Sequence, residues 1–322
     1  MTASIGPGRY DAVVVGAGFA GMYSLLRLRE LGFRSAVFEV ADDVGGTWYW
    51  NRYPGARCDI ESMDYSYSFS PELQQEWEWT ERYATQPEIL RYANHVADRF
   101  DLRRDIQFNT RVVGATYDER DGVWEVTTDC GDTVSAQFLI MAAGVLSTPK
   151  LPEIPGIESF AGATYHTANW PHAGVDLSGL RVGVIGTGSS GIQSIPLIAE
   201  QADHLTVFQR TPNFSSPALN APLDPTFVAA RKAGYEEYRK AARQSHIGVV
   251  IPHRDDLATA ADPAEREENF RSGWTQGTLF GLASKYADVL IDPAANEYVA
   301  EFVRERIKEV VTDPDVATKL AP

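Results

Sequence analysis

The sequence of 322 residues is poor in cysteine, basic residues and long apolar runs. Cys58 and Cys130 are its only cysteines, which excludes a disulfide framework and makes a reducing cytoplasm the simplest setting. No apolar run is long enough to span a membrane. Against 44 acidic residues stand 29 basic ones, a net charge of −15. Nucleic-acid and membrane partners are therefore disfavoured, because both need Lys and Arg to neutralise phosphate.

Several motifs that carry chemistry are missing as well. The six histidines show no metal-ligand spacing with one another or with the cysteines, so no metal site is expected. The sequence has no H-E-x-x-H motif, no nucleophile elbow and no Walker-type phosphate loop. Zinc hydrolase, serine hydrolase and kinase functions are therefore disfavoured. We expect the chemistry to belong to a bound cofactor.

Short apolar runs alternate with helical stretches, a pattern typical of βαβ units and a parallel sheet. The pattern predicts one such unit near the N-terminus and a second beyond residue 180. The expected elements are strands at 11–15, 35–40, 123–128, 138–141, 181–185 and 205–209, and helices at 20–31, 86–100 and 191–201. Residues 225–319 are expected to be largely helical, and residues 65–69 suit either a strand or a loop.

A glycine-rich motif follows the first predicted strand, where Gly16, Gly18 and Gly21 form the pattern G-x-G-x-x-G. The first glycine permits a tight turn, the second lets the backbone approach a pyrophosphate, and the third lets helix pack on strand. The N-terminus of the helix then favours the anion. Glu39 lies 23 residues after Gly16, where a carboxylate can accept hydrogen bonds from the ribose hydroxyls of FAD or NAD.

A second motif of the same form, G-T-G-S-S-G, spans residues 186–191 between another predicted strand and helix. The position that corresponds to Glu39 is occupied by Gln209, and Arg210 and Thr211 follow directly. An arginine here can hold the 2′-phosphate of NADP, which a carboxylate would repel. A surface ion pair is the other interpretation of Arg210.

Two such motifs in one chain indicate FAD together with NADPH, because a plain dehydrogenase needs only one. Flavoprotein disulfide reductases and flavoprotein monooxygenases use both cofactors. A reductase needs a pair of redox cysteines close to the flavin, whereas Cys58 has no partner at Cys-x-x-Cys or Cys-x4-Cys spacing. The sequence therefore argues against a reductase.

Two longer motifs resemble a known family. Residues 160–171 match F-x-G-x-x-x-H-x-x-x-W-P, the fingerprint of the Baeyer–Villiger monooxygenases, with His166 and Trp170 at fixed positions. Residues 45–59 resemble the second signature of that family, which ends in an aspartate, here Asp59. Among the members of this family, the sequence closely resembles phenylacetone and cyclohexanone monooxygenases. The resemblance covers essentially the whole chain and is weakest from residue 220 to 292.

The resemblance implies an FAD- and NADPH-dependent monooxygenase. Such an enzyme inserts one oxygen atom from O2 next to a ketone carbonyl and gives an ester or lactone through a flavin peroxide. In this family the peroxide must stay anionic and dry, because a proton or water would release hydrogen peroxide. An active-site arginine and an NADP⁺ that stays bound meet this requirement in the family.

The resemblance also implies roles for single residues. Arg57 and Asp59 are expected at the nicotinamide end, with Asp59 pairing with the arginine of the family. His166, the third catalytic candidate, is either a hinge residue or an ordinary hydrogen-bonded linker histidine. FAD contacts are expected for Gly16, Gly18, Phe19, Gly21, Glu39, Gly46, Thr47, Trp48, Asp59, Tyr65 and Val112. NADP contacts are expected for Gly186, Thr187, Gly188, Ser189, Ser190, Gly191, Gln193, Arg210 and Thr211.

We therefore predict an α/β fold with two Rossmann-like dinucleotide-binding domains and a helical insertion. The expected parts are an FAD-binding domain at 1–145, a fingerprint linker at 146–175, the first part of an NADP-binding domain at 176–217 and a mostly helical insertion at 218–322. Residues 313–322 resemble the segment just before the family's arginine, so we expect a shortened chain that oxygenates ketones poorly alone. Two alternatives stay open: an N- or S-oxygenating flavin-containing monooxygenase, whose members usually carry Tyr or Phe at the position of Trp170, and a non-catalytic FAD- and NADP-binding fragment.

Overall fold

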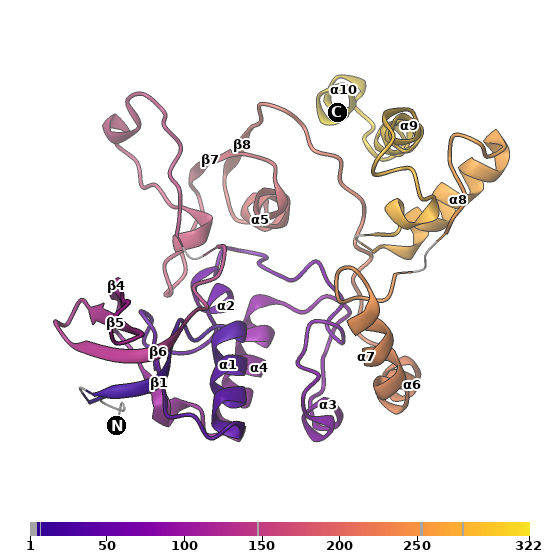
Figure 1. The fold of residues 1–322 in the computed structure, drawn as a ribbon. Helices are drawn as coiled ribbons and strands as arrows, with labels where there is room; N and C mark the ends of the chain where they lie inside the picture. The colour runs from indigo at the N-terminus through magenta and orange to yellow at the C-terminus, as the bar shows by residue number, and fades with distance from the viewer. Residues whose placement is uncertain (1–4, 7, 147, 252–253, 279) are drawn as a thin grey trace. The chain divides into compact units, whose positions relative to one another are not determined.

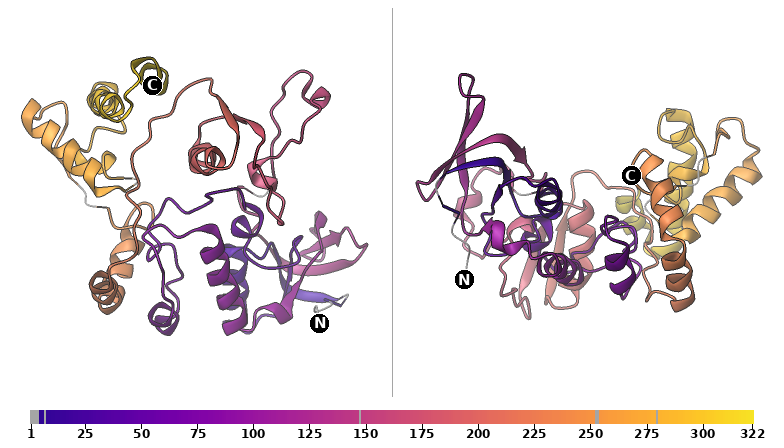
Figure 2. Two further views of the ribbon diagram at one scale, coloured as in Figure 1. Left: turned by 180° about the vertical axis from the view of Figure 1, so that it is seen from behind. Right: turned by 60° about the horizontal axis from the view of Figure 1, so that its bottom comes forward.

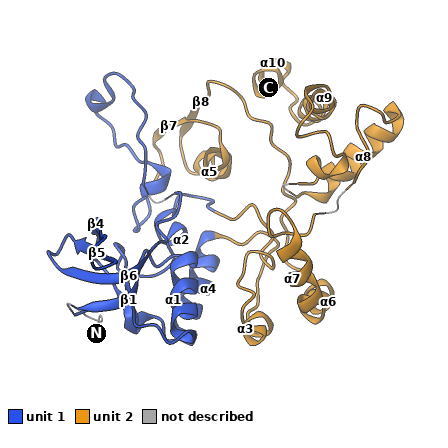
Figure 3. Ribbon diagram, viewed as in Figure 1, with its two compact units in different colours: residues 1–56, 86–176 blue, residues 57–85, 177–322 orange. Residues whose placement is uncertain are grey.

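The computed structural model describes residues 5–6, 8–146, 148–251, 254–278 and 280–322. The chain divides into two compact units (Figure 3). Unit 1 comprises residues 1–56 and 86–176, and unit 2 comprises residues 57–85 and 177–322. The first glycine-rich motif lies in unit 1 and the second in unit 2.

The elements of unit 1 are a sheet and a few helices (Figure 1). Its strands are Arg9–Val15 (β1), Ser35–Phe38 (β2), Ile106–Gln107 (β3), Val112–Asp118 (β4), Val123–Thr128 (β5) and Thr133–Met141 (β6). Its helices are Phe19–Glu30 (α1), Thr47–Trp50 (α2) and Gln86–Arg99 (α4), with single 3-10 turns at Arg103–Asp105, Ile157–Ser159 and Thr167–Asn169.

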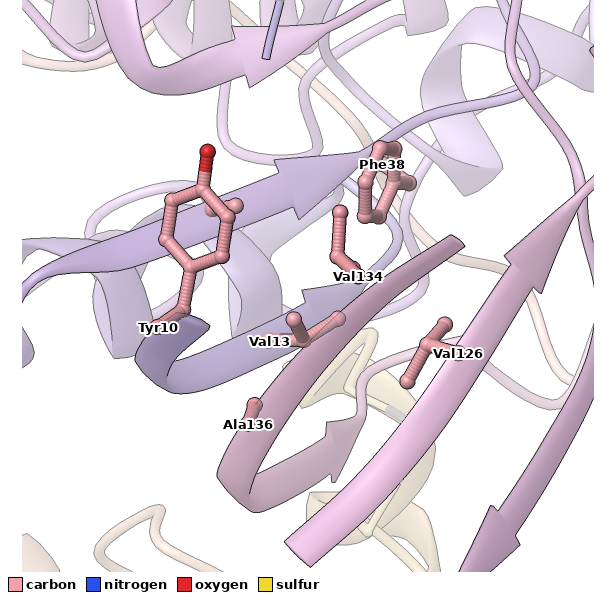
Figure 4. Close-up of a cluster of buried hydrophobic side chains, with 7 residues drawn as sticks. Tyr10, Val13, Phe38, Val126, Val134 and Ala136 are labelled. Atoms are coloured by element: carbon pink, nitrogen blue, oxygen red, sulfur yellow. The ribbon is translucent and has the colours of Figure 1, made fainter. Parts of the chain in front are cut away.

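The sheet of unit 1 has the strand order β3-β2-β1-β6-β5-β4. β1 runs parallel to both β2 and β6, whereas β5 is antiparallel to β4 and β6. Apolar residues of the strands form one buried cluster, in which Val13, Phe38 and Val126 lie close together (Figure 4). From β1 the strand order runs through β2 to β3 on one side and continues with β6 on the other, so the carboxyl end of β1 lies at a switch point, where open α/β sheets bind ligands. The first glycine motif begins there.

Unit 2 combines a two-stranded sheet with helices. Its strands, Arg181–Ile185 (β7) and His204–Phe208 (β8), are parallel, and helix Ser189–Ala199 (α5) packs on both. The other helices are Pro71–Glu76 (α3), Pro225–Ala233 (α6), Tyr235–Gln244 (α7), Pro263–Gln276 (α8), Pro293–Val310 (α9) and Pro314–Leu320 (α10), with a 3-10 turn at Ala283–Lys285. In Figure 2 helices α6 to α10 form the orange and yellow part of the ribbon.

Asp-Pro pairs start four of these helices. Asp224, Asp262, Asp292 and Asp313 are the N-caps of α6, α8, α9 and α10, and each accepts a hydrogen bond from a backbone N–H of the first turn. The proline that follows fits the first helical position, because no hydrogen bond is lost there. Helices α8 and α9 share a buried cluster around Phe270 and Phe302.

Most predicted elements are confirmed. The strands expected at 123–128 and 181–185 have the predicted bounds, and α1, α4, α5 and β8 differ from prediction by one or two residues at their ends. Residues 65–69, left open between strand and loop, form a loop. Residues 57–85 belong to unit 2 and not to unit 1, which contains the first glycine motif. The four-part domain division stays a prediction.

The α/β fold with a parallel-rich sheet is as expected. Across the described part of the chain, no helix combines the length and the apolar character that a membrane crossing needs. The same residues contain no group of His, Cys, Asp or Glu suited to hold a metal ion.

Candidate functional site

The first glycine motif forms a tight turn between β1 and α1. Gly16 adopts φ +101°, and a Cβ there would lie 2.6 Å from the carbonyl oxygen of Ala142. A Cβ on Gly21 would overlap the carbonyl oxygen of Gly16. Gly18 is the N-cap of α1 at φ −74°, and Gly46 approaches it so closely that a Cβ on Gly46 would lie 2.9 Å from the Gly18 Cα. Only glycine fits this turn.

Glu39 follows β2 and is 4% exposed. Its Oε2 accepts a hydrogen bond from the Ala17 backbone N–H at 2.5 Å, and its Oε1 accepts one from Ala41 at 2.8 Å. A carboxylate offers about four lone-pair sites, so two stay available for ribose hydroxyls. Glu39 thus fixes the turn and still fits the predicted ribose contact.

The loop into α2 lies beside this turn. Gly45 and Gly46 adopt φ +124° and φ +55°, values that favour glycine. Trp48 is buried, and its carbonyl oxygen accepts a hydrogen bond from the Gln86 side chain. Thr47 is the first residue of α2 and accepts a backbone hydrogen bond from Asn51 at 2.9 Å.

The second glycine motif repeats the backbone of the first. Gly186 adopts φ +100°, Gly188 is the N-cap of α5 at φ −73°, and a Cβ on Gly191 would lie 2.5 Å from the Gly186 carbonyl oxygen. Ser189 and Ser190 begin α5. Thr187 lies inside the turn, and its carbonyl oxygen accepts a hydrogen bond from Asn213 at 3.0 Å.

Neither the backbone conformation nor the packing requires glycine at position 188. Its φ of −73° is open to any residue, and a Cβ there would meet no atom within 4 Å. The position is exposed, at the N-terminus of α5. A pyrophosphate can reach the free backbone N–H groups of the turn only where no side chain fills the space in front of them. The turn therefore fits a dinucleotide.

The residues after β8 differ from Glu39 in charge and in burial. Gln209 is half-buried and its side chain donates a hydrogen bond to the Lys319 carbonyl oxygen. Arg210 and Thr211 are exposed. The guanidinium of Arg210 is thus open to an anionic ligand at the edge of the second turn.

Arg57 and Asp59, expected at the nicotinamide end, and Gln193, expected to contact NADP, come together in unit 2. The Gln193 Nε2 donates hydrogen bonds to the Asp59 Oδ1 at 2.9 Å and to the Arg57 carbonyl oxygen at 3.3 Å. The Arg57 N–H donates to the Gln193 Oε1 at 3.4 Å. The segment with the two charged candidates is therefore fastened to α5.

The segment that contains Arg57 and Asp59 has two further partners, Glu81 and Asn220, which belong to neither signature. The Arg57 guanidinium lies 3.5 Å from a carboxylate oxygen of Glu81, which also accepts a hydrogen bond from Asn220. Asn220 lies where the family resemblance is weakest, and Glu81 lies outside both signatures. No local signal in the sequence could have paired them.

The fingerprint linker lies in unit 1. His166 is the N-cap of the turn Thr167–Asn169, and its Nδ1 accepts a hydrogen bond from the Ala168 N–H at 3.1 Å. This hydrogen bond fits an ordinary hydrogen-bonded linker histidine, and the role of His166 stays a prediction. Trp170 is buried against Tyr53 and Ala56 of the second signature. The two family motifs therefore contact each other within one unit.

The other expected residues are placed separately. Phe19 begins α1 with its ring 6.1 Å from that of Tyr92, and Val112 begins β4. Tyr65 lies in the loop at 65–69, in unit 2. Cys58 is buried, and burial raises the pKa of its thiol to about 11. A thiol that stays protonated at neutral pH is a poor nucleophile, which agrees with the argument against a disulfide reductase.

Comparison with known proteins gives long matches. The chain is 45% identical over 315 residues to the Baeyer–Villiger monooxygenase of Pseudooceanicola batsensis, a match that covers 97% of this chain and 58% of that protein. It is 43% identical to the phenazine N-monooxygenase PhzNO1 of Lysobacter antibioticus, with the same coverage. The crystal structure of cyclohexanone monooxygenase from Rhodococcus sp. Phi1 bound to NADP⁺ matches with a TM-score of 0.95 at 44% identity, covering 98% of this chain and 60% of that one.

The chain thus spans about 58% of the length of these curated relatives. The similarity over nearly its whole length confirms the resemblance to the Baeyer–Villiger monooxygenases and the expected pair of dinucleotide-binding folds. The pyridine nucleotide-disulphide oxidoreductase family matches residues 13–258, more than two thirds of the chain. The chain belongs to the pyridine nucleotide-disulphide oxidoreductase family.

Proposed function

We propose that this chain is part of a flavoprotein monooxygenase that uses FAD, NADPH and O2 to convert a ketone into an ester or lactone. The observation that carries the proposal is the duplicated glycine turn, with a buried Glu39 beside one copy and an exposed Arg210 beside the other. The similarity to Baeyer–Villiger enzymes, among them acetone and cyclohexanone monooxygenases, supports a ketone substrate.

FAD is assigned to the turn of unit 1. The N-terminus of α1 would hold the pyrophosphate, and the free lone pairs of Glu39 would accept the ribose hydroxyls. NADP is assigned to the turn of unit 2, where α5 would hold the pyrophosphate and Arg210 the 2′-phosphate. Both cofactors, when bound, supply the electrons and the activation of O2 that no side chain provides.

The roles of Arg57 and Asp59 follow from their charges. Arg57 provides a fixed positive charge, partly balanced by Glu81, which would stabilise negative charge near the reacting ketone. Asp59 provides an exposed carboxylate that would orient a cationic or amide group of the ligand. His166 is assigned a structural role in the linker, because its Nδ1 is engaged by the backbone.

The test uses the purified chain with added FAD. We expect one bound flavin per chain, seen as flavin absorbance that stays with the protein, and tighter binding of NADPH than of NADH in calorimetry. Under ¹⁸O2, cyclohexanone is expected to yield a small amount of lactone carrying one ¹⁸O atom. A colourless chain that binds neither FAD nor NADPH would refute the proposal. Stoichiometric lactone would refute only the expected impairment of the chain alone.

N-oxygenation is a second candidate, because the phenazine N-monooxygenase is nearly as similar as the Baeyer–Villiger relative. Offering a ketone and an aromatic N-heterocycle in the same reaction separates the two. We expect labelled lactone; labelled N-oxide without lactone would favour the second candidate. Binding of both cofactors with neither product above a no-protein control would favour a non-catalytic binding function.

The domain division and the cellular location are part of the same proposal. We assign residues 1–145 to FAD binding, 146–175 to the linker, 176–217 to NADP binding and 218–322 to the helical insertion. A cytoplasmic location is supported by the two free cysteines.

A further inference from the structure

Gln193 lies in the second turn of α5, close to the predicted pyrophosphate site, and its half-buried side chain donates hydrogen bonds to other residues of the protein. An amide side chain has two N–H donors on Nε2. One donates to the Asp59 carboxylate at 2.9 Å and the other to the Arg57 carbonyl oxygen at 3.3 Å. Neither donor is left for a ligand unless one of these hydrogen bonds is broken.

The backbone of Arg57 explains why a side chain is needed here. Arg57 pairs with Thr85 in an antiparallel bridge, in which Cys58 donates its N–H to the Ala84 carbonyl oxygen at 3.1 Å. In such a bridge the N–H and C=O of the central residue point away from the partner segment. The Gln193 amide takes up both groups, as a neighbouring strand would. Left unpaired, they would cost free energy when shielded from water.

We propose that Gln193 is a positioning residue, which acts on NADP through Asp59 instead of binding NADP directly. One amide fastens the carboxylate of Asp59 and the backbone of Arg57 to the helix that begins at the second glycine turn. The pyrophosphate site and the charged segment are thereby held in one fixed geometry. The proposal rests on the proposed function and replaces the direct NADP contact expected for Gln193.

The test is a double-mutant cycle on NADP⁺ binding by the FAD-loaded chain. We expect Gln193→Ala and Asp59→Ala each to weaken binding roughly tenfold, the size of one charge-assisted hydrogen bond. The double variant should bind within about twofold of Asp59→Ala, because a residue that acts only through Asp59 has nothing more to lose. Gln201→Ala, an exposed glutamine just beyond α5, is the matched control and should bind normally.

Losses that multiply, to roughly a hundredfold in the double variant, would mean a direct ligand and overturn the proposal. A Gln193→Ala variant that bound NADP⁺ as tightly as the wild-type chain would overturn the proposal as well. Hydrogen exchange without cofactors gives an independent readout: the Arg57 amide should exchange faster in Gln193→Ala, and equal rates would show that the hydrogen bond does not hold the segment. If the wild-type chain bound neither FAD nor NADP⁺, the proposed function itself would fail, and the exchange result would still report on the segment.

Discussion

The two glycine-rich turns have the same backbone and different surroundings. The φ angles are +101° and +100° at Gly16 and Gly186, and −74° and −73° at Gly18 and Gly188. Outside the glycines, the two motifs share no residue. The spacing of the glycines between a strand and a helix is therefore enough to specify the turn, because the first glycine of each motif adopts a positive φ and the third leaves no room for a Cβ.

The surroundings differ in how closed they are. A Cβ on Gly18 would lie 3.4 Å from Gly46, whereas a Cβ on Gly188 would meet no atom within 4 Å. Glu39 is buried, whereas Arg210 is exposed. A closed site suits a cofactor that stays bound through many turnovers, and an open site suits one that enters and leaves. The comparison predicts that FAD is retained on purification and that NADP is not.

The largest expected effect comes from the third glycine of each motif. In Gly21→Ala the new Cβ would overlap the Gly16 carbonyl oxygen, so we expect loss of flavin and a destabilisation of about 3 kcal/mol or more. Gly191→Ala should be milder, because its Cβ would lie 2.5 Å from the Gly186 oxygen and the site is only half-buried. Denaturant unfolding and flavin absorbance measure both. Equal effects would contradict the difference between a closed and an open turn.

Glu39→Ala should have the next largest effect. It leaves the N–H groups of Ala17 and Ala41 without their acceptor, each at a cost of about 1–3 kcal/mol, and it removes the predicted ribose contact. We expect lower stability together with at least tenfold weaker FAD binding, measured by fluorescence titration. Glu30→Ala, at the exposed end of α1, is the control and should change neither. Normal FAD affinity in Glu39→Ala would limit the residue to a structural role.

Sequence patterns predicted the two turns and most elements, because glycine spacing and apolar periodicity act locally. The sequence also predicted Glu39 and Arg210, which follow the second strand of each βαβ unit, because the unit fixes the number of residues between the first glycine and the end of that strand. The pairing of Arg57 with Glu81, and the position of Asn220 beside it, could not be predicted. These contacts join segments more than 20 and 130 residues apart along the chain, and no periodic pattern encodes such a meeting. The hydrogen bonds that join Gln193 to Arg57 and Asp59 span more than 130 residues and could not be predicted either.

Gly188→Ala separates the needs of the fold from those of the ligand. The backbone angles accept alanine and no atom is near, so we expect the free energy of unfolding to change by less than about 1 kcal/mol. NADP⁺ should nevertheless bind roughly a hundredfold more weakly, because the methyl group blocks backbone N–H groups that donate charge-assisted hydrogen bonds. Calorimetry and thermal unfolding on one preparation measure the two effects. An unchanged NADP⁺ affinity would remove the second turn as the NADP site.

The smallest effect should come from Arg210→Ala, which tests the charge difference between the two sites. The guanidinium is exposed, so its loss should leave stability unchanged and weaken NADP⁺ binding roughly tenfold, while NAD⁺ binding stays constant. Arg243→Ala, an exposed arginine at the end of α7, should affect neither nucleotide and controls for net charge. If the substitution weakened the binding of NADP⁺ and of NAD⁺ equally, Arg210 would not be the residue that recognises the 2′-phosphate. Discrimination would then have to come from residues other than those after β8, and the contrast with Glu39 would lose its meaning.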